Sequence, residues 1–195
     1  MQLSEQLFIG NEIRRAAEDF AALRISVFYD FPYLYEGTLE YELEYIQTYA
    51  QSPNALLFGI YDGEKMVGAT TCVPMEEETD DVKAPFETNG LNVNDYLYFG
   101  ESIILPAYRG LGYGKRFFEI REQQAKDLGK TKTCFCSVDR LIDHPLKPEN
   151  YRDNAGLWTK MGYTEQRHLS CEMKWLDRNE IKETSKRLIF WTKEL

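Results

Sequence analysis

The sequence of 195 residues holds few of the residue types that bind metals or cross-link secreted chains. It has two histidines, and its four cysteines form no Cys-x-x-Cys pair. This spacing matches neither a zinc site nor a disulfide framework, so we predict no metal and reduced thiols in a cytoplasmic protein. Cys134 and Cys136 lie two apart in a predicted strand, where we expect them to share one face as small packed residues.

Long apolar runs and an excess of positive charge are also missing. No stretch approaches the roughly 18 apolar residues of a membrane span, and the first ten residues lack the basic and apolar regions of a signal peptide. Acidic residues number 32 against 23 basic ones, which gives a net charge of −9. Because nucleic acid and anionic lipid attract clustered Lys and Arg, we expect neither nucleic acid nor a membrane as partner.

The residues that are present indicate a folded domain. Hydrophobic residues make up 43% of the chain and aromatic ones 14%, and helix-type and strand-type patterns alternate along it. We therefore predict one α/β (α+β) domain over residues 1–195.

Hydrophobic periodicity gives the expected elements. Helices are predicted at 12–28 (with Asn11 as N-cap), 39–51, 112–128 and 153–161. Strands are predicted at 3–9, 55–61, 65–74, 96–105, 131–138, 165–175 and 186–193. Polar links are predicted at 30–38, 76–95 and 139–152. The apolar segment Leu188–Trp191 suits either the interior of the sheet or pairing with a second subunit, so a homodimer is one expectation.

The segment that points to a function is 103–118, where an apolar strand leads through a glycine-rich loop directly into a helix. Glycines let backbone amides approach a ligand closely, and the amides here are also the unpaired donors of a helix N-terminus. Together with the helix dipole they favour a pyrophosphate. The glycines are Gly110, Gly112 and Gly114, and nearby positive charge comes from Arg109, Lys115 and Arg116.

The spacing of these glycines excludes two common phosphate motifs. The dinucleotide fingerprint is Gly-x-Gly-x-x-Gly, whereas the spacing here is Gly-x-Gly-x-Gly. The P-loop requires Ser or Thr after its lysine, whereas Lys115 is followed by Arg116. An unrelated nucleotide-phosphate binder and a turn without a ligand remain as alternatives.

Arg-x-x-Gly-x-Gly after a strand that ends in proline resembles the coenzyme A-binding motif of the GNAT N-acetyltransferase superfamily. The predicted order of elements matches that family over most of the chain. Residues 154–163 (NAGLWTKMGY) resemble its second signature, a short helix that ends in Gly-Phe or Gly-Tyr. The resemblance implies a mixed, mostly antiparallel central sheet of about six to seven strands flanked by helices. It also implies direct transfer of an acetyl group from acetyl-CoA to a primary amine of a small molecule or peptide.

The resemblance assigns cofactor-binding roles to three parts of the chain. In the family, the strand before the loop splays from its neighbour and pairs with the pantetheine arm, which here implies the main chain of Ile103 and Ile104. Asn154 is a candidate for a further contact to that arm. The pyrophosphate would lie on Arg109, Gly110, Leu111, Gly112, Tyr113, Gly114 and Lys115.

Two residues are candidates for catalysis. Glu101, on the strand side shared with Ile103, is either the general base or an ordinary carboxylate paired with Lys or Arg. The family commonly has a tyrosine, the general acid, five residues before the aromatic residue that closes the second signature. In this sequence that position is Trp158. Tyr151 is therefore the candidate general acid, with Tyr163 or water as alternatives and packing as the simpler role. Because of Trp158, an acyl-CoA-binding sensor with little or no transferase activity is the alternative function.

The acceptor site is the least defined feature. An aromatic cluster in the first two helices and their link could line an apolar or cation-accepting pocket, or simply pack as core. The acidic run at 76–81 could attract a polyamine or basic peptide, or could be a solvated loop. The aromatic residues are Phe28, Tyr29, Phe31, Tyr33, Tyr35, Tyr41 and Tyr45.

Overall fold

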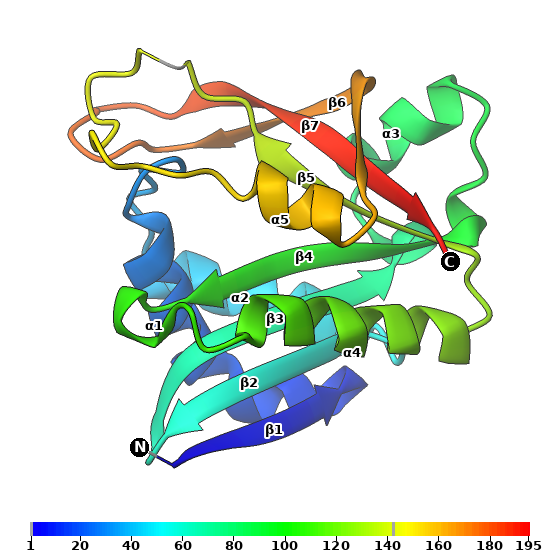
Figure 1. Cartoon of the computed structure of the whole chain (residues 1–195), viewed down its shortest axis with the longest axis horizontal. Coiled ribbons are helices and arrows are strands. Elements are labelled where there is room, and N and C mark those ends of the chain that lie inside the picture. Colours follow the sequence, from blue (N-terminus) through cyan, green and yellow to red (C-terminus); the bar gives the residue numbers. More distant parts are fainter. Residues whose placement is uncertain (1, 142) are drawn as a thin grey trace.

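The computed structural model describes residues 2–141 and 143–195, which form a seven-stranded sheet with helices on both faces (Figure 1). The predicted loop 139–152 is described apart from residue 142. The strands are β1 (Leu3–Ile9), β2 (Leu56–Asp62), β3 (Lys65–Pro74), β4 (Tyr96–Ile104), β5 (Lys132–Val138), β6 (Thr164–Trp175) and β7 (Thr184–Glu194). The helices are α1 (Ala17–Phe28), α2 (Leu39–Gln51), α3 (Asp80–Thr88), α4 (Tyr113–Asp127) and α5 (Ala155–Lys160). Short 3₁₀ turns occupy Gly10–Ala16, Met75–Glu77, Val93–Asp95 and Pro106–Tyr108.

The strand order is β1-β2-β3-β4-β5-β7-β6. All neighbouring strands are antiparallel except β4 and β5, which are parallel. This confirms the predicted mixed, mostly antiparallel sheet. Because β7 lies between β5 and β6, the segment Leu188–Trp191 lies inside the sheet, and the homodimer stays a prediction.

The two parallel strands diverge. β4 pairs with β5 only from Tyr96 to Tyr98, opposite Lys132–Cys134, and Figure 1 shows the strands running apart beyond this point. β4 continues beside β3 as far as Ile104, and β5 continues beside β7. From Phe99 onward, one edge of β4 therefore has no neighbouring strand among the described residues, which leaves backbone donors and acceptors available.

β4 also carries a bulge at its centre. Thr70 pairs with Ser102 and Cys72 with Phe99, so Gly100 and Glu101 together oppose a single residue of β3. The extra residue shifts the alternation of side chains, and Glu101 turns toward the α1–α2 face. A Cβ atom on Gly100 would lie 2.1 Å from the hydroxyl oxygen of Tyr49, so only glycine fits there.

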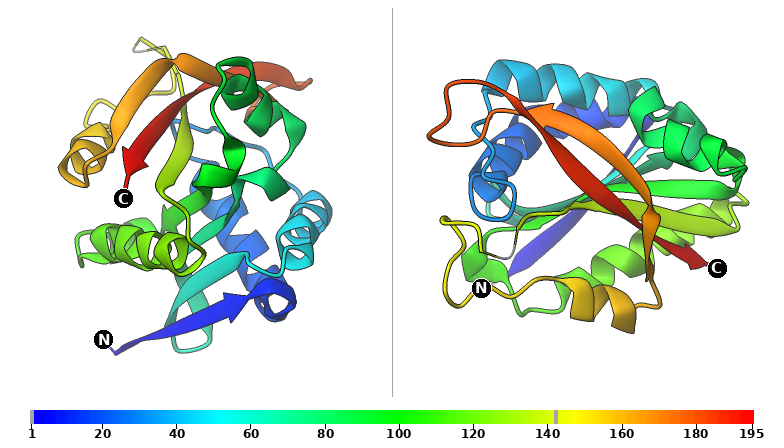
Figure 2. Two further views of the ribbon diagram at one scale, coloured as in Figure 1. Left: turned by 90° about the vertical axis from the view of Figure 1, so that its right-hand side faces the viewer. Right: turned by 90° about the horizontal axis from the view of Figure 1, so that it is seen from above.

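The sheet separates the core into two layers, each covered by helices (Figure 2). α1, α2 and α3 cover one face of the sheet, whereas α4 and α5 cover the other. Cys134 and Cys136 both join the first layer, and all four cysteines are free, as expected. No helix among the described residues is long and apolar enough to cross a membrane.

The predicted start of the first helix is wrong. Residues 10–16 form a 3₁₀ turn, and the α-helix begins at Ala17. Gly10 has a φ of +55° and lies against Pro53, so the chain turns sharply there. Asn11 consequently lies inside the turn, where its Oδ1 accepts from Arg14 Nε at 2.7 Å instead of capping a backbone amide.

The link predicted at 76–95 contains a helix, α3. Asp80 and Asp81 are in its first turn, where negative charge favours a helix N-terminus. Val82 and Phe86, four residues apart, form its buried side. The density of acidic residues and the internal Pro85 conceal this pattern in the sequence.

Candidate functional site

The glycine loop leaves the backbone open to solvent at the start of α4. Gly110 and Gly112 have φ values of +80° and +89°, a region that other residues rarely adopt. A Cβ atom at either position would meet nothing within 4 Å. The loop therefore needs glycine for its conformation and exposes its main chain to any ligand.

The amides of this loop form a row of free donors. The first α4 amides with a backbone acceptor are those of Lys115 and Arg116, which donate to Gly112 O at 3.1 and 3.2 Å. The amides of residues 110–114 have no acceptor in the described parts of the chain. Such donors at a helix N-terminus, where the dipole is positive, suit an anion.

Three cations surround the loop. The Lys115 ammonium lies 3.3 Å from Glu119, and the Arg116 guanidinium lies 3.5 Å from Glu5. Both pairs are well exposed, and pairs of this kind contribute at most about 1 kcal/mol, so these side chains are available to an incoming anion. The third cation, Arg109, donates from Nε to the carbonyl of Ile104 at 3.2 Å, which ties the loop to the end of β4.

The backbone N–H and C=O groups of Ile103 and Ile104, the two predicted cofactor-binding residues of β4, point to opposite edges of the strand. The amide of Leu105 donates to Val67 O on β3 at 2.9 Å. Backbone groups in an antiparallel ladder alternate between the two edges. Ile103 therefore directs its N–H and C=O to β3, whereas Ile104 directs them to the free edge. Of the two isoleucines, the geometry leaves Ile104 and, by the same alternation, Ser102 for an extended ligand.

α5 packs against the start of α4. Leu157 Cδ2 lies 3.2 Å from the position of a Cβ on Gly114. Asn154 directly precedes α5 and makes no capping hydrogen bond, because Asp153 Oδ1 accepts from the Ala155 amide instead. The exposed side-chain amide of Asn154 thus has no hydrogen-bond partner among the described residues, and Asn154 lies next to the helix that packs on the glycine loop.

A cavity of about 640 Å³ opens on the α1–α2 face of the sheet and reaches the bulge of β4. Five of the seven aromatic residues that the sequence singles out line it, together with Tyr98 and Trp175. The five are Phe28, Tyr33, Tyr35, Tyr41 and Tyr45. Its carboxylates are Glu78, Asp81, Glu101 and Glu172, and its cations are Arg24 and Lys174.

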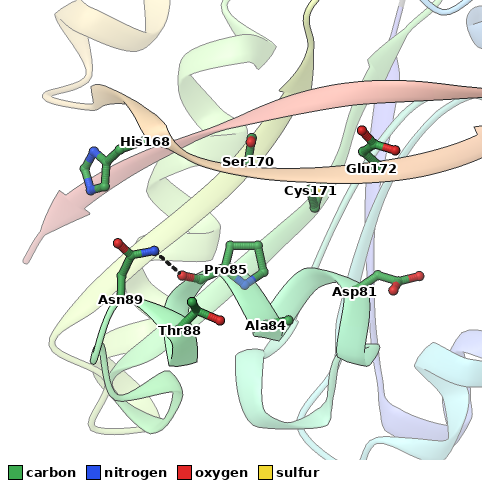
Figure 3. Close-up of a pocket in the computed structure, with 9 residues that line it drawn as sticks. All are labelled: Asp81, Ala84, Pro85, Thr88, Asn89, His168, Ser170, Cys171 and Glu172. Atoms are coloured by element: carbon green, nitrogen blue, oxygen red, sulfur yellow. Dashed lines mark hydrogen bonds between the residues drawn. The ribbon is translucent and has the colours of Figure 1, made fainter.

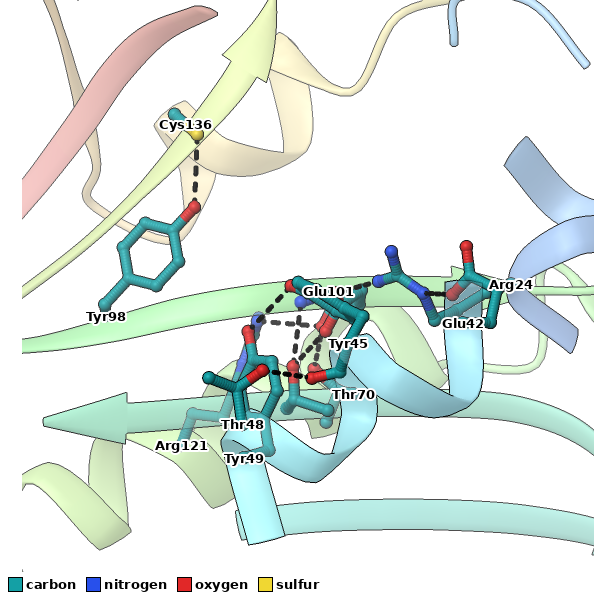
Figure 4. Close-up of polar contacts among 11 residues, drawn as sticks. Arg24, Glu42, Tyr45, Thr48, Tyr49, Thr70, Tyr98, Glu101, Arg121 and Cys136 are labelled. Carbon is teal, nitrogen blue, oxygen red and sulfur yellow. Dashed lines mark hydrogen bonds and ion pairs between the residues drawn. The ribbon is translucent and has the colours of Figure 1, made fainter. Parts of the chain in front are cut away.

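Glu101 lies at the buried end of this cavity and is 4% exposed. Its carboxylate accepts from Arg24 Nη1 and from the hydroxyl of Tyr45 at 3.0 Å (Figure 4). It also accepts from Thr71 Oγ1. Burial raises the pKa of Tyr45 to about 12, so at neutral pH this hydroxyl keeps its proton and donates. Three donors therefore fix the carboxylate on the cavity floor.

Arg24 joins Glu101 to a second buried carboxylate, Glu42. Burial alone would lower the pKa of Arg24, but Tyr45 and Glu42 outweigh it and the pKa lies above its ordinary value. Nothing in the sequence pattern indicated Glu42. Glu101 is paired with an arginine, as in the alternative of an ordinary strand carboxylate, and it also lines a cavity, so its role as general base stays a prediction.

Arg121 is a second buried cation, on the opposite face of β4. It donates from Nη1 to the carbonyl of Glu101 at 3.3 Å, and Thr70 Oγ1 donates to the same oxygen at 2.6 Å. Burial lowers the pKa of Arg121 to about 10. These contacts satisfy the bulge carbonyl, which the β3 ladder does not reach.

The candidate acids occupy different surroundings. Tyr151 packs edge-on against Phe31, with ring centroids 4.7 Å apart, and lies outside the cavity lining. Burial, followed by Asp153, raises its pKa, and nearby Arg109 opposes the rise. Tyr163 is 2% exposed and its hydroxyl lies 2.8 Å from Thr133 Oγ1, as its packing role predicts.

Trp158, at the usual tyrosine position, is part of an aromatic cluster. Its ring lies 5.1 Å from both Phe135 and Trp191, in edge-on arrangements. The described residues contain no group of three His, Cys, Asp or Glu side chains that could hold a metal ion.

Sequence comparison decides the family. The pattern of the acetyltransferase (GNAT) family matches residues 21–146, about two thirds of the chain. The chain belongs to the GNAT acetyltransferase family. No curated protein sequence matches it with significance.

Solved structures of low sequence identity share the GNAT fold. A GNAT-family acetyltransferase from Streptococcus pneumoniae is 14% identical, with full coverage of both chains and a TM-score of 0.60. A ribosomal-protein-alanine N-acetyltransferase from Brucella melitensis is 11% identical, with full coverage of both chains and a TM-score of 0.62. A Salmonella typhimurium protein whose structure includes its cofactor acetyl-CoA is 10% identical, with 98% and 94% coverage and a TM-score of 0.59.

Proposed function

We propose that the chain is an acetyl-CoA-dependent N-acetyltransferase that transfers an acetyl group directly to a primary amine of a small molecule or peptide. Residues 1–195 would form one domain for this reaction. The observation that carries the proposal is the row of free amides at 110–114, which adjoins the free edge of β4 and leads to Glu101 and the cavity. Acetyl-CoA supplies an acetyl group activated as a thioester.

The residues present fit the parts of acetyl-CoA. The amides of 110–114, with Arg109 and Lys115, would hold the pyrophosphate. The main chain of Ile104 and Ser102 would pair with the pantetheine arm, and Asn154 would add a contact. A backbone amide of the unpaired β4 edge would donate to the oxyanion that forms during transfer.

Proton transfers would fall to Glu101 and Tyr151. An alkylamine with a pKa near 10.4 must lose a proton before it attacks, and Glu101 is the proposed general base on the cavity floor, directly or through water. Tyr151 is the proposed donor to the leaving thiolate, because a tyrosine hydroxyl keeps its proton at neutral pH. A thiolate leaves readily, so we expect Tyr151 to matter less than Glu101.

A second candidate function is an acyl-CoA-binding module with little transferase activity. The observation that favours it is Trp158, which replaces the usual tyrosine and is engaged in aromatic packing. Release of free thiol from acetyl-CoA in the presence of an amine separates the two functions.

Calorimetric titration with acetyl-CoA, coenzyme A and ADP tests the cofactor. We expect micromolar binding of the first two and its loss in Gly112→Trp, because the indole would cover the open amides. Gly90→Trp is the matched control, since Gly90 also has a positive φ (+72°) with nothing within 4 Å of a Cβ, but lies after α3. Binding of ADP as tight as that of coenzyme A would instead indicate the unrelated phosphate binder.

A further inference from the structure

The cavity beside Glu101 has an acidic rim that transfer to a simple amine does not require. We infer that the acceptor is a small aliphatic amine with a second positive charge, and that the rim carboxylates hold this second charge. The inference rests on the proposed function, because it takes the cavity as the acceptor site.

The rim carries three carboxylates, contributed by two segments of the chain. Glu78 precedes α3, Asp81 lies in the first turn of α3, and Glu172 projects from β6. Figure 3 shows Asp81 and Glu172 at the same end of the groove between α3 and β6, with His168 at the other end. Asp81 and Glu172 are exposed, whereas Glu101 is buried, so the cavity runs from an acidic opening to an acidic floor.

Glu78 is the rim group that most favours a bound cation. It is half-buried, and no Lys or Arg nitrogen lies within 4.0 Å of it among the described residues. The nearby Lys83 pairs with Asp80 at 3.1 Å. Burial raises the pKa of Glu78, and hydrogen bonds from the Thr79 amide at 3.1 Å and from the Tyr49 hydroxyl offset only part of this rise. An ammonium group beside the carboxylate would offset more of the cost of burial.

Arg24 shows why the second charge belongs at the rim. Its guanidinium lies over the rings of Tyr45 and Phe28, at 4.3 and 5.0 Å from their centroids. The protein's own cation thus occupies these aromatic faces, and Glu42 and Glu101 balance it on either side. The aromatic walls near the floor offer apolar contact for the methylene groups of an acceptor.

The charges of the lining predict discrimination among acceptors. Four lining carboxylates face two cations, of which Lys174 is exposed and can turn into solvent. A volume of about 640 Å³ is in the range of small-molecule sites. A diamine should therefore bind better than a monoamine of equal length, and an amine that carries a carboxylate should bind worst.

Three acceptors of similar length test this: 1,4-diaminobutane, pentylamine and 5-aminopentanoate. Their binding is measured by calorimetry at pH 8 on the protein saturated with coenzyme A. Thiol release is measured separately with acetyl-CoA. We expect the diamine to bind about tenfold more tightly than pentylamine, since three partly exposed ion pairs contribute together.

The variant Glu78→Gln/Asp81→Asn/Glu172→Gln should reduce this preference to about twofold or less. Glu77→Gln is the control, because Glu77 is an exposed neighbour outside the lining; it should keep the preference. Equal binding of diamine and pentylamine, tighter binding of 5-aminopentanoate, or a preference that survives in the triple variant would overturn the inference. Selective diamine binding without thiol release would support the assignment of the cavity and refute the transferase function.

Discussion

At the scale of single residues, Glu101 and Glu42 share one guanidinium, but only Glu101 faces the cavity. Glu101→Gln removes the proposed base and keeps the shape of the side chain. We expect kcat to fall about a hundredfold or more, the typical contribution of a general base, with little change in acetyl-CoA affinity. Steady-state kinetics and calorimetry provide the two measurements.

Glu42→Gln is the matched control for this experiment. Each substitution removes one of the two buried carboxylates that pair with Arg24 and should cost about 3 kcal/mol of unfolding free energy. Glu42 is outside the cavity lining, so its variant should keep most of its turnover once folded. If Glu101→Gln retains the same turnover as Glu42→Gln, Glu101 is a structural carboxylate and not the base.

The sequence predicts some site residues better than others. The loop glycines are predictable because positive φ and close approach require glycine, and the following helix supplies the donors. Arg24 and Glu42 are not, because polar helix residues are usually exposed and only their partner on a distant strand explains their burial. Gly100 is likewise explained only by the Tyr49 hydroxyl that lies against it.

At the scale of elements, an ion cluster fastens the α1–α2 link to the β6–β7 hairpin. Arg140 donates to the carbonyls of Pro32 and Tyr33 at 2.7 and 2.6 Å and binds both oxygens of Asp177 at 2.7 and 2.8 Å. Lys186 also lies 3.0 Å from Asp177. Because Tyr33 and Trp175 line the cavity on the two sides of this contact, the cluster holds the cavity wall together.

This cluster predicts a pH dependence of stability. Partial burial would raise the pKa of Asp177, but hydrogen bonds from Arg140 and Lys186 outweigh it and the pKa lies below its ordinary value. The native state therefore binds this proton less readily than the unfolded chain. The stabilisation is fully present above the unfolded pKa of about 3.9 and is lost as pH falls through the lower native pKa.

Asp177→Asn should lower the unfolding free energy by about 2 kcal/mol at pH 7. The difference in unfolding free energy between the variant and the parent protein should stay constant down to about pH 5 and become smaller below about pH 4. Urea unfolding at several pH values measures it. Asp139→Asn is the control, because Asp139 pairs with Arg187 at 3.7 Å in an exposed position and should contribute little. A difference in unfolding free energy that grows as the pH falls would contradict the assignment of this pH dependence to the Asp177 carboxylate.

Elements with strong periodicity were predictable from the sequence, whereas local departures from it were not. The helix at 39–51 and the strands agree with the structure to within a few residues, because their apolar positions repeat at one period. α3 was not predicted, because its acidic run masks the helical period. The 3₁₀ turn before α1 was not predicted either, because the chain turns tightly at Gly10.

At the scale of the whole molecule, the site exists because the two halves of the sheet, β1–β4 and β5–β7, pair over only three residues of each strand, β4 and β5. The free β4 edge, the glycine loop and the cavity come from segments far apart in the chain. No local sequence pattern gives the length of that pairing, and only the family resemblance implies that the strands diverge.

Hydrogen exchange tests whether acetyl-CoA binds along this divergence. Saturating acetyl-CoA should slow exchange in two segments, 99–104 and 110–114. In the first, the amides of Ser102 and Ile104 face the free edge, and in the second the amides lack an acceptor among the described residues. At a hundred times its Kd it should add about 2.7 kcal/mol to the unfolding free energy and raise Tm by roughly 5–10 °C for a chain of this size. ADP should protect 110–114 alone, because it has a pyrophosphate but no pantetheine arm. Protection by acetyl-CoA at 110–114 without protection at 99–104 would mean that the arm does not pair with β4, and the proposed position of the thioester beside Glu101 would then be wrong.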